Sequence, residues 1–202
     1  MTTAKWTESW RLFWLLSLIL AAMALGLLFA TGWTTEGYRL VIRATARTSL
    51  ILFLAAFAAS AAARLWPGAF THWLRRNRRQ FGLSFAMSHL IHALAIFTLW
   101  RSDPDTFWRL SNKGSIVSGG IAYLFIAALA VTSFDAAVQI LGPKAWGWLH
   151  WAGVWFIAIS FIFTNGKRIP VSSWYALPVT LVIAAVILRI AAKQRRRGPA
   201  AT

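Results

Sequence analysis

A chain of 202 residues that is 58% hydrophobic and only 13% charged has too little polar surface for a soluble domain of this size. The absence of cysteine excludes disulfides and every thiolate-bound metal or cluster. The net charge of +16 resides mostly in short segments between apolar runs. Lysines and arginines in such places contact membrane lipids through their headgroups, and they do not indicate nucleic-acid binding.

Six apolar runs are long enough, at about 20 residues each, to cross a bilayer. They cover residues 12–30, 48–66, 81–100, 116–136, 146–164 and 175–192. The first run is long and lacks a convincing small-residue cleavage site, so we expect a retained helix rather than a signal peptide. The pattern predicts an all-α fold, a polytopic membrane protein built as a six-transmembrane-helix bundle with no room for a separate soluble domain.

Basic residues indicate how this bundle is oriented. Six crossings place both ends of the chain on one side of the membrane. The N-terminal segment, the 67–80 and 137–145 loops and the C-terminal tail carry the majority of the lysines and arginines. Because positively charged loops stay inside, we expect both termini to be cytoplasmic.

Histidine is the unusual residue within these runs, because an ionisable side chain is costly to bury in hydrocarbon. His89 and His92 lie in the third run and His150 in the fifth. Three-residue spacing places His89 and His92 on one helix face, about 60° apart and ~4.5 Å apart along the axis. Counted from the nearest basic residues, His89 lies ~15 Å and His150 ~9 Å into parallel helices. The three imidazoles are therefore expected at comparable depths.

Imidazoles at similar depths on two parallel helices are what a bis-histidine haem requires, since its axial ligands approach from opposite faces. His89 and His92 share one face of one helix and cannot enclose a single haem between them. We therefore expect one haem b, held by His150 together with either His92 or His89. The alternatives are histidines that only bond a neighbouring helix in a structural subunit, and a haem-free, histidine-lined proton or metal-ion pathway.

Arginines at both ends of the runs are candidates to hold haem propionates, or they are only topology signals. Arg78 and Arg79 lie at the inner end of the third run, and Arg43 and Arg47 precede the second. Asp135 is expected to answer a nearby cation, and no residue is assigned a catalytic role. Three phenylalanines could pack against a porphyrin or simply within the bundle: Phe85, Phe97 and Phe163.

Three motifs in order give the chain a family resemblance over residues 43–168. They are "RATARTSLILFLAAFAASAAARL", "RRQFGLSFAMSHLIH" and "AVTSFDAAVQILGPKAWGWLH". This series resembles the ferric-reductase-like transmembrane family, and within it the haem-binding membrane subunits of bacterial methionine sulfoxide reductase systems. The resemblance implies one such domain over residues 1–202 and places family haem ligands on His92 and His150. A second family histidine on the fifth helix would fall on Phe163, whereas His89 is additional to the pattern.

The resemblance also implies a function, which is electron transfer in the bacterial inner membrane. Only about ten residues follow the sixth run, and they contain no glycine-rich phosphate loop. We therefore expect a separate electron donor, either a flavin reductase or quinol. The acceptor is expected to be a periplasmic or membrane protein. Whether the chain acts as an enzyme, or only as an oxidoreductase subunit without its own flavin or nicotinamide domain, stays open.

Overall fold

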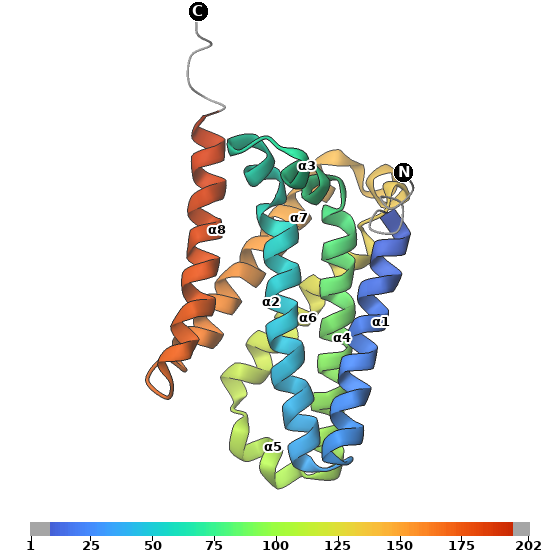
Figure 1. The fold of residues 1–202 in the computed structure, drawn as a ribbon, viewed down its shortest axis with the longest axis vertical. Helices are drawn as coiled ribbons and strands as arrows, with labels where there is room; N and C mark the ends of the chain where they lie inside the picture. The colour runs from blue at the N-terminus through green and yellow to red at the C-terminus, as the bar shows by residue number, and fades with distance from the viewer. Residues whose placement is uncertain (1–8, 196–202) are drawn as a thin grey trace, which may run out of the picture.

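The structure, a computed structural model, describes residues 9–195, and their secondary structure is helical throughout (Figure 1). Six segments are long and apolar enough to cross a membrane, which confirms the expected fold class. The long helices are α1 (Ser9–Thr31), α2 (Thr35–Leu65), α4 (Arg78–Ser102), α6 (Lys113–Val131), α7 (Asp135–Gly166) and α8 (Ala176–Gln194). The short ones are α3 (Ala69–Arg76), α5 (Pro104–Leu110) and the 3-10 helix η2 (Ser173–Tyr175).

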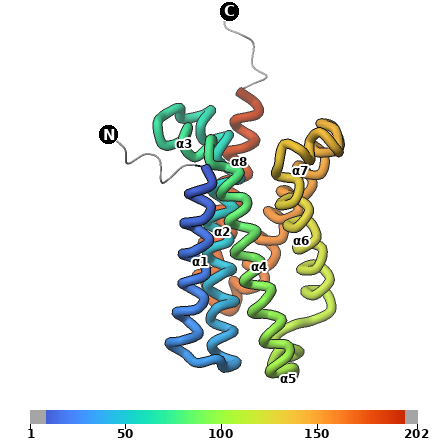
Figure 2. The backbone as a smooth tube through the Cα atoms, turned by 90° about the vertical axis from the view of Figure 1, so that its right-hand side faces the viewer, coloured from blue at the N-terminus to red at the C-terminus, as the bar shows by residue number. Residues whose placement is uncertain are grey.

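Successive long helices alternate in direction, so the described chain starts and finishes at the same end of the bundle (Figures 1 and 2). Helix α3 and the connection from α6 to α7 lie at that end, which we call the α3 end. Helix α5 and the α1–α2 and α7–α8 connections lie at the other, the α5 end. The terminal segments themselves, residues 1–8 and 196–202, lie outside the described residues.

Helix α2 is longer than hydropathy predicts, because it begins at Thr35 instead of near residue 48. The hydroxyl of Thr34 caps this start by accepting a hydrogen bond from the Gly37 N–H at 3.3 Å. Of the arginines that lowered the apparent hydropathy, Arg47 is exposed, while Arg39 and Arg43 are half-buried and pair with Glu36. Capping and charge pairing thus extend the helix over residues 35–47, which are too polar to be recognised as part of a membrane-spanning run.

Helix α7 also begins early, at Asp135, but its first part does not continue the crossing. Gly142 has φ 75° and ψ 154°, a left-handed conformation that interrupts the helix, and Pro143 follows without a backbone N–H. The crossing segment therefore starts near Pro143, in agreement with the expected run at 146–164. The preceding run, expected to reach residue 136, ends at Val131.

Helices α2 and α4 form the centre of the molecule and share the most extensive helix–helix contact. Helix α1 packs against both, while α6 and α7 form a second pair beside them (Figure 2). Phe53 of α2 joins the two groups, because its ring centroid lies 5.6 Å from that of Phe85 on α4 and 5.4 Å from that of Phe161 on α7. This aromatic cluster holds α7 against the central pair.

Helix α8 returns along α2 and is held there by two reciprocal hydrogen bonds. Arg189 of α8 donates to the Phe57 carbonyl at 2.8 Å, and Arg64 of α2 donates to the Ala192 carbonyl at 3.0 Å. The Arg189 guanidinium also lies 4.3 Å from the centroid of the Phe57 ring. Carbonyls and an aromatic face thus replace a carboxylate as partners for this half-buried cation.

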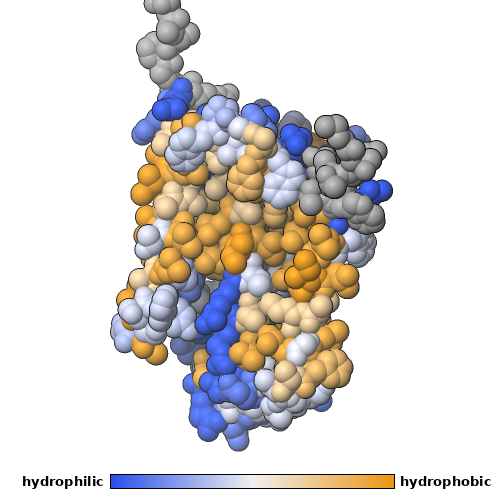
Figure 3. All heavy atoms as spheres, in the orientation of Figure 1, coloured by the Kyte–Doolittle hydropathy of each residue, from blue (hydrophilic) through white to orange (hydrophobic). Residues whose placement is uncertain are grey.

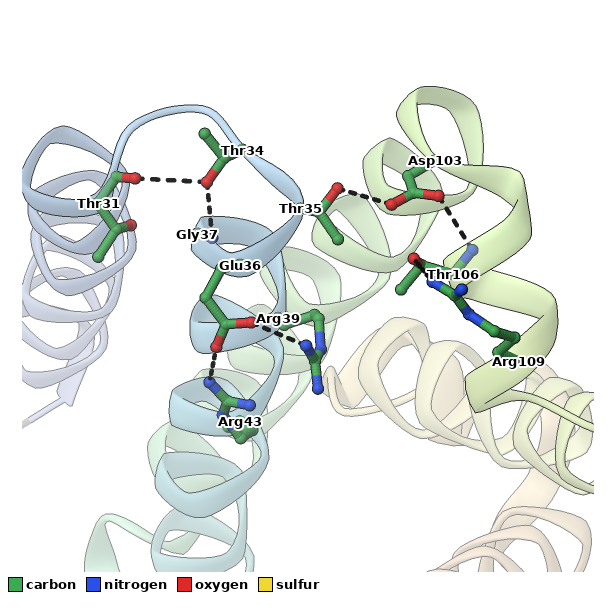
Figure 4. A network of polar contacts seen from close by, with 10 residues as sticks. All are labelled: Thr31, Thr34, Thr35, Glu36, Gly37, Arg39, Arg43, Asp103, Thr106 and Arg109. Carbon is green, nitrogen blue, oxygen red and sulfur yellow. Dashed lines mark hydrogen bonds and ion pairs between the residues drawn. The ribbon is translucent and has the colours of Figure 1, made fainter.

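Polar residues gather at the two ends of the molecule and leave an apolar band between them (Figure 3). A hydrophilic stripe rises from the α5 end into this band. At that end Thr35 donates to Asp103 at 2.9 Å, and Asp103 accepts from the Thr106 N–H at 3.0 Å (Figure 4). Arg109 in turn donates to the Thr106 hydroxyl. This network fastens the α1–α2 turn to the α4–α5 turn.

Candidate functional site

A row of small polar side chains lines the contact between α2 and α4. On α4, Ser84, Ser88 and His92 recur every fourth residue and so share one face. On α2, Ser49 donates to the Ser88 hydroxyl at 2.9 Å, and Ser88 donates to the Thr45 carbonyl at 3.2 Å. Both serines of α4, with Thr45 and Ser49, are completely buried. Small side chains allow the helices to approach closely and to form these hydrogen bonds.

His92 lies at one end of this row, with Nδ1 2.8 Å from the Thr45 hydroxyl oxygen. That oxygen is also 2.7 Å from the Val41 carbonyl, a separation that requires the hydroxyl hydrogen to lie between the two oxygens. The Thr45 oxygen can therefore only accept from His92, so Nδ1 carries the hydrogen. In the neutral imidazole, Nε2 then keeps a free lone pair, as a metal ligand requires.

His89 lies one turn earlier among aromatic rings. Ring centroids lie at 4.5 Å for Phe85, 5.8 Å for Tyr123 and 6.3 Å for Phe161, and the His92 ring is 5.7 Å away. Nδ1 of His89 is buried and makes no hydrogen bond within the described chain. The Tyr123 hydroxyl is likewise buried without a partner among these residues. Two unsatisfied polar atoms therefore belong to facing rings on α4 and α6.

His150 is held differently, on the pair formed by α6 and α7. Its ring stacks on Trp146 with centroids 4.1 Å apart, and Nε2 lies 3.0 Å from the Thr132 hydroxyl. The Thr132 oxygen is 2.5 Å from the Ala128 carbonyl, so its own hydrogen is directed there. Nε2 of His150 must therefore be the donor, and the free lone pair of this imidazole is on Nδ1.

The structure brings His89 and His92 together, but it does not bring His150 to them. Tyr123, which faces His89, and Thr132, which binds His150, are nine residues apart on α6, or ~13 Å of helix. Phe161, also beside His89, is eleven residues from His150 on α7, or ~16 Å. The expectation of comparable depth is thus corrected. His150 lies about two turns inside the crossing segment, close to the expected depth, so the difference comes from how the helices are offset against one another.

Two of the four candidate arginines are paired with carboxylates. Arg43 donates to Glu36 at 2.6 Å and Arg79 to Asp135 at 2.7 Å, the latter confirming that Asp135 answers a cation. Arg47 is exposed on α2.

The remaining candidate, Arg78, donates to the Ser60 hydroxyl at 3.1 Å, and its charge acts on His150. Arg168, in the connection after α7, was not anticipated, and its charge acts on His92. His150 and His92 therefore each interact electrostatically with one arginine.

Of the three candidate phenylalanines, only Phe85 is buried and contacts a histidine. Phe97 and Phe163 are 56% and 73% exposed on the outer surface of the bundle. Four residues that surround the histidines were not predicted from the sequence: Thr45, Thr132, Tyr123 and Phe161. One signal was available, since the four-residue spacing of Ser84, Ser88 and His92 marks a polar helix face that must find polar partners.

Direct metal binding by side chains alone finds no support in residues 9–195. No group of three or more His, Asp or Glu side chains is placed there to hold a metal ion.

Comparison with known proteins gives a consistent picture. A family model described as "Ferric reductase like transmembrane component" matches residues 42–161, a range that contains His89, His92 and His150. Three curated relatives are each named "Protein-methionine-sulfoxide reductase heme-binding subunit MsrQ". The Ralstonia nicotianae protein is 30% identical over 141 residues, which cover 68% of this chain and 63% of the relative.

The other two relatives match over shorter stretches. The Azospira oryzae protein is 38% identical over 92 residues, covering 44% of this chain and 38% of that protein. The Polaromonas naphthalenivorans protein is 32% identical over 79 residues, covering 38% and 36%. The matched regions thus span between about one third and just under two thirds of these relatives. No solved structure matches the chain.

Proposed function

The chain belongs to the ferric-reductase-like transmembrane family, and on this premise we propose that it is a haem-binding membrane subunit that carries electrons between separate proteins or cofactors. The observation that carries the proposal is the α4 site, where His92 keeps Nε2 free while Thr45 holds Nδ1. The three relatives named as haem-binding subunits support the same reading. The proposed haem is of the b type, because the chain has no cysteine for covalent attachment.

The residues around α4 fit such a group. An imidazole with a free Nε2 would be able to bind haem iron, and the other nitrogen of a metal-binding histidine is normally hydrogen-bonded to a neighbour, as Nδ1 of His92 is to Thr45. The flat rings of Phe85 and Phe161 offer an apolar lining beside His89. The buried and unpartnered atoms of His89 and Tyr123 indicate that the site is completed by a group other than the described chain.

His150 enters the proposal as the imidazole of α7. Measured along the helices, His150 lies ~13–16 Å from the α4 pair, and its Nε2 donates a hydrogen bond to the Thr132 hydroxyl. For His150 to share one iron with His92 or His89, its ring must therefore leave Thr132, and α7 must shift toward the α5 end. If the helices stay as they are, His150 serves a separate level of the bundle. The haem content of single variants distinguishes these two arrangements.

Bound haem supplies a one-electron carrier whose potential follows its ligands and surroundings. The chain's own residues orient that carrier and keep it dry. Thr45 fixes the ring of His92, and Phe85 and Phe161 exclude water from the side facing His89. A dry, low-dielectric setting strengthens the electrostatic effect of nearby charges on the carrier.

Haem carboxylates need cationic partners, and one arginine interacts electrostatically with each of His150 and His92. Arg78 acts on His150 from the α3 end, and Arg168 acts on His92 from the α5 end. We propose Arg168 for a haem on His92 and Arg78 for one on His150, because bidentate arginine–carboxylate contacts are strong. The arginines already paired with Glu36 and Asp135 are less available for this task.

Donor and acceptor complete the proposed function. We propose that a flavin reductase or quinol delivers electrons, and that a periplasmic or membrane protein receives them. We also propose the bacterial inner membrane as the location, with the α3 end cytoplasmic. The excess of lysine and arginine in the segments assigned to that end supports this orientation.

The experiment that tests the function is a dithionite-reduced minus air-oxidised spectrum of the purified full chain, with haem quantified as the pyridine haemochromogen. Alanine variants of His89, His92 and His150 are compared with wild type. His72→Ala serves as the matched control, because His72 is exposed on α3. We expect bound haem in wild type and in the control, and its loss or conversion to high spin in His92→Ala.

The His150 variant then separates the two arrangements. Loss of the same haem as in His92→Ala means that both histidines serve one iron. An unchanged spectrum means that the α4 site stands alone. A folded wild-type protein that takes up no haem, even on reconstitution, would overturn the proposal and return the histidines to an ion pathway or a structural role. Ion flux in liposomes then decides between those two.

A further inference from the structure

Two threonines hold the membrane histidines in opposite hydrogen-bonding states. Thr45 accepts from Nδ1 of His92, whereas Thr132 accepts from Nε2 of His150. In each case the hydroxyl hydrogen is directed to a carbonyl of the same helix, at 2.7 Å for Val41 and 2.5 Å for Ala128. Each threonine is therefore an acceptor toward its histidine, beside a backbone carbonyl, that of Ile42 for His92 and that of Thr132 for His150.

We propose that Thr45 is a positioning residue that presents Nε2 of His92 to haem iron, while Thr132 withholds Nε2 of His150. The inference rests on the proposed haem function and deepens it, because it assigns the two imidazoles unequal roles. His92 is preset for ligation through Nε2. His150 is preset as a donor and can ligate through Nε2 only after its bond to Thr132 is broken.

The surroundings of Thr45 keep its hydroxyl in this state. The residue is completely buried, and its oxygen lies near two carbonyls of its own helix, at 2.7 Å and 3.2 Å. If the Thr45 hydroxyl rotated to donate its hydrogen to His92, the Val41 carbonyl would lose its hydrogen bond and face an oxygen lone pair. The Thr45 carbonyl is meanwhile fixed by Ser88 of α4. The α2–α4 contact thus holds both the hydroxyl and the helix that carries its histidine partner.

An effect on haem properties follows from this bond. A hydrogen bond donated by Nδ1 raises the basicity of Nε2, which favours Fe(III) over Fe(II) and lowers the midpoint potential. Removing the acceptor reverses the effect. A tenfold loss of this preference for Fe(III) corresponds to about 59 mV for a one-electron couple.

The test compares Thr45→Val, Thr45→Ser and Thr132→Val in the full chain. Valine keeps the shape of threonine but removes the acceptor, and serine restores the hydroxyl. We expect Thr45→Val to weaken haem retention roughly 10–100-fold and to raise the midpoint potential of what remains. Thr45→Ser should keep both values near wild type. Thr132→Val, the matched control, should leave the His92 haem unchanged, and the backbone carbonyl of residue 132 remains there as a partner for the His150 ring.

A second readout does not depend on haem. Nitrogen-15 NMR of histidine-labelled protein without haem distinguishes the two neutral tautomers, and His92→Asn identifies the signal of that residue. We expect wild-type His92 to carry its hydrogen on Nδ1 and His150 to carry it on Nε2. In Thr45→Val the His92 signal should become a mixture, and in Thr45→Ser it should not.

These outcomes separate the inference from the function beneath it. Haem-loaded wild type with an unchanged spectrum and potential in Thr45→Val overturns the positioning role and leaves the function intact. The same is true if serine fails as badly as valine, since packing alone would then explain the loss. A protein that takes up no haem refutes the function, and the NMR spectra still decide whether Thr45 sets the tautomer of His92.

Discussion

Replacing Ser88 by alanine probes the polar contact that holds the two central helices together. The Ser88 hydroxyl donates to the Thr45 carbonyl at 3.2 Å, accepts from Ser49 at 2.9 Å and lies 3.1 Å from the Thr48 hydroxyl. Interhelical hydrogen bonds within membranes contribute about 0.6 kcal/mol on average and about 1.7 kcal/mol at most. Loss of these three contacts should therefore cost roughly 1–2 kcal/mol, or about a 5–30-fold change in the unfolding equilibrium.

Ser84 offers a matched control one turn away. It is equally buried on the same face of α4, but its hydroxyl has no partner among the described residues. Ser84→Ala should therefore be neutral or slightly stabilising. Unfolding in mixed micelles of increasing SDS content, followed through the fluorescence of the 13 tryptophans, measures both variants.

A double-mutant cycle shows whether the hydrogen bond itself is responsible. If Ser49 and Ser88 act as a pair, the double alanine variant should cost less than the sum of the single variants by about 0.5 kcal/mol or more. Strictly additive costs, or a Ser84→Ala loss as large as that of Ser88→Ala, would show that the reasoning is wrong. The row of hydroxyls would then act through packing alone.

Two further predictions concern the α5 end. Gly37→Ala should strongly destabilise the α1–α2 turn, because the added Cβ would lie 2.3 Å from the Gly32 carbonyl oxygen. Gly119→Ala is the control, since its Cβ meets open space and should be tolerated. The same SDS titration measures both variants, and equal losses of stability would contradict the prediction. The Thr106 N–H and hydroxyl bind Asp103 and lower the pKa of its carboxyl. The stabilisation from Asp103 is therefore present above its ordinary pKa of about 3.9 and is lost as pH falls through the lowered value. Asp103→Asn should remove this acid-dependent loss, as thermal unfolding of both proteins across pH 2–6 will show, and equal pH dependence in the two would refute it.

The arginines show where composition is an incomplete guide to a membrane protein. Arg43 and Arg79 read equally well as topology signals and as haem partners, and the structure pairs each with a carboxylate of the chain. Arg168 gave no signal in the sequence, yet it is the arginine whose charge reaches His92. Which arginine interacts with His92 depends on how the helices pack, and residue spacing in the sequence does not show this.

The crossing helices followed from the sequence, because hydrocarbon admits only long apolar helices that satisfy their own backbone. Their ends did not, since Thr34 caps α2 and Gly142 interrupts α7 through local bonds and angles that hydropathy does not register. The short helices α3 and α5 were likewise missed, as each lies outside the apolar runs.

Amino-acid sequence alone predicted the candidate site, because a histidine in an apolar run is costly enough to imply a purpose. It could not tell which ring nitrogen of His92 or His150 is free, since that depends on the threonine opposite each ring and on where its hydroxyl hydrogen points. Nor could it show how far His150 lies from the α4 pair, because that distance depends on which residues of α6 meet each histidine, Tyr123 for His89 and Thr132 for His150. The sequence shows which residue types are present, and only the packed helices show their hydrogen-bond partners and their positions along the bundle.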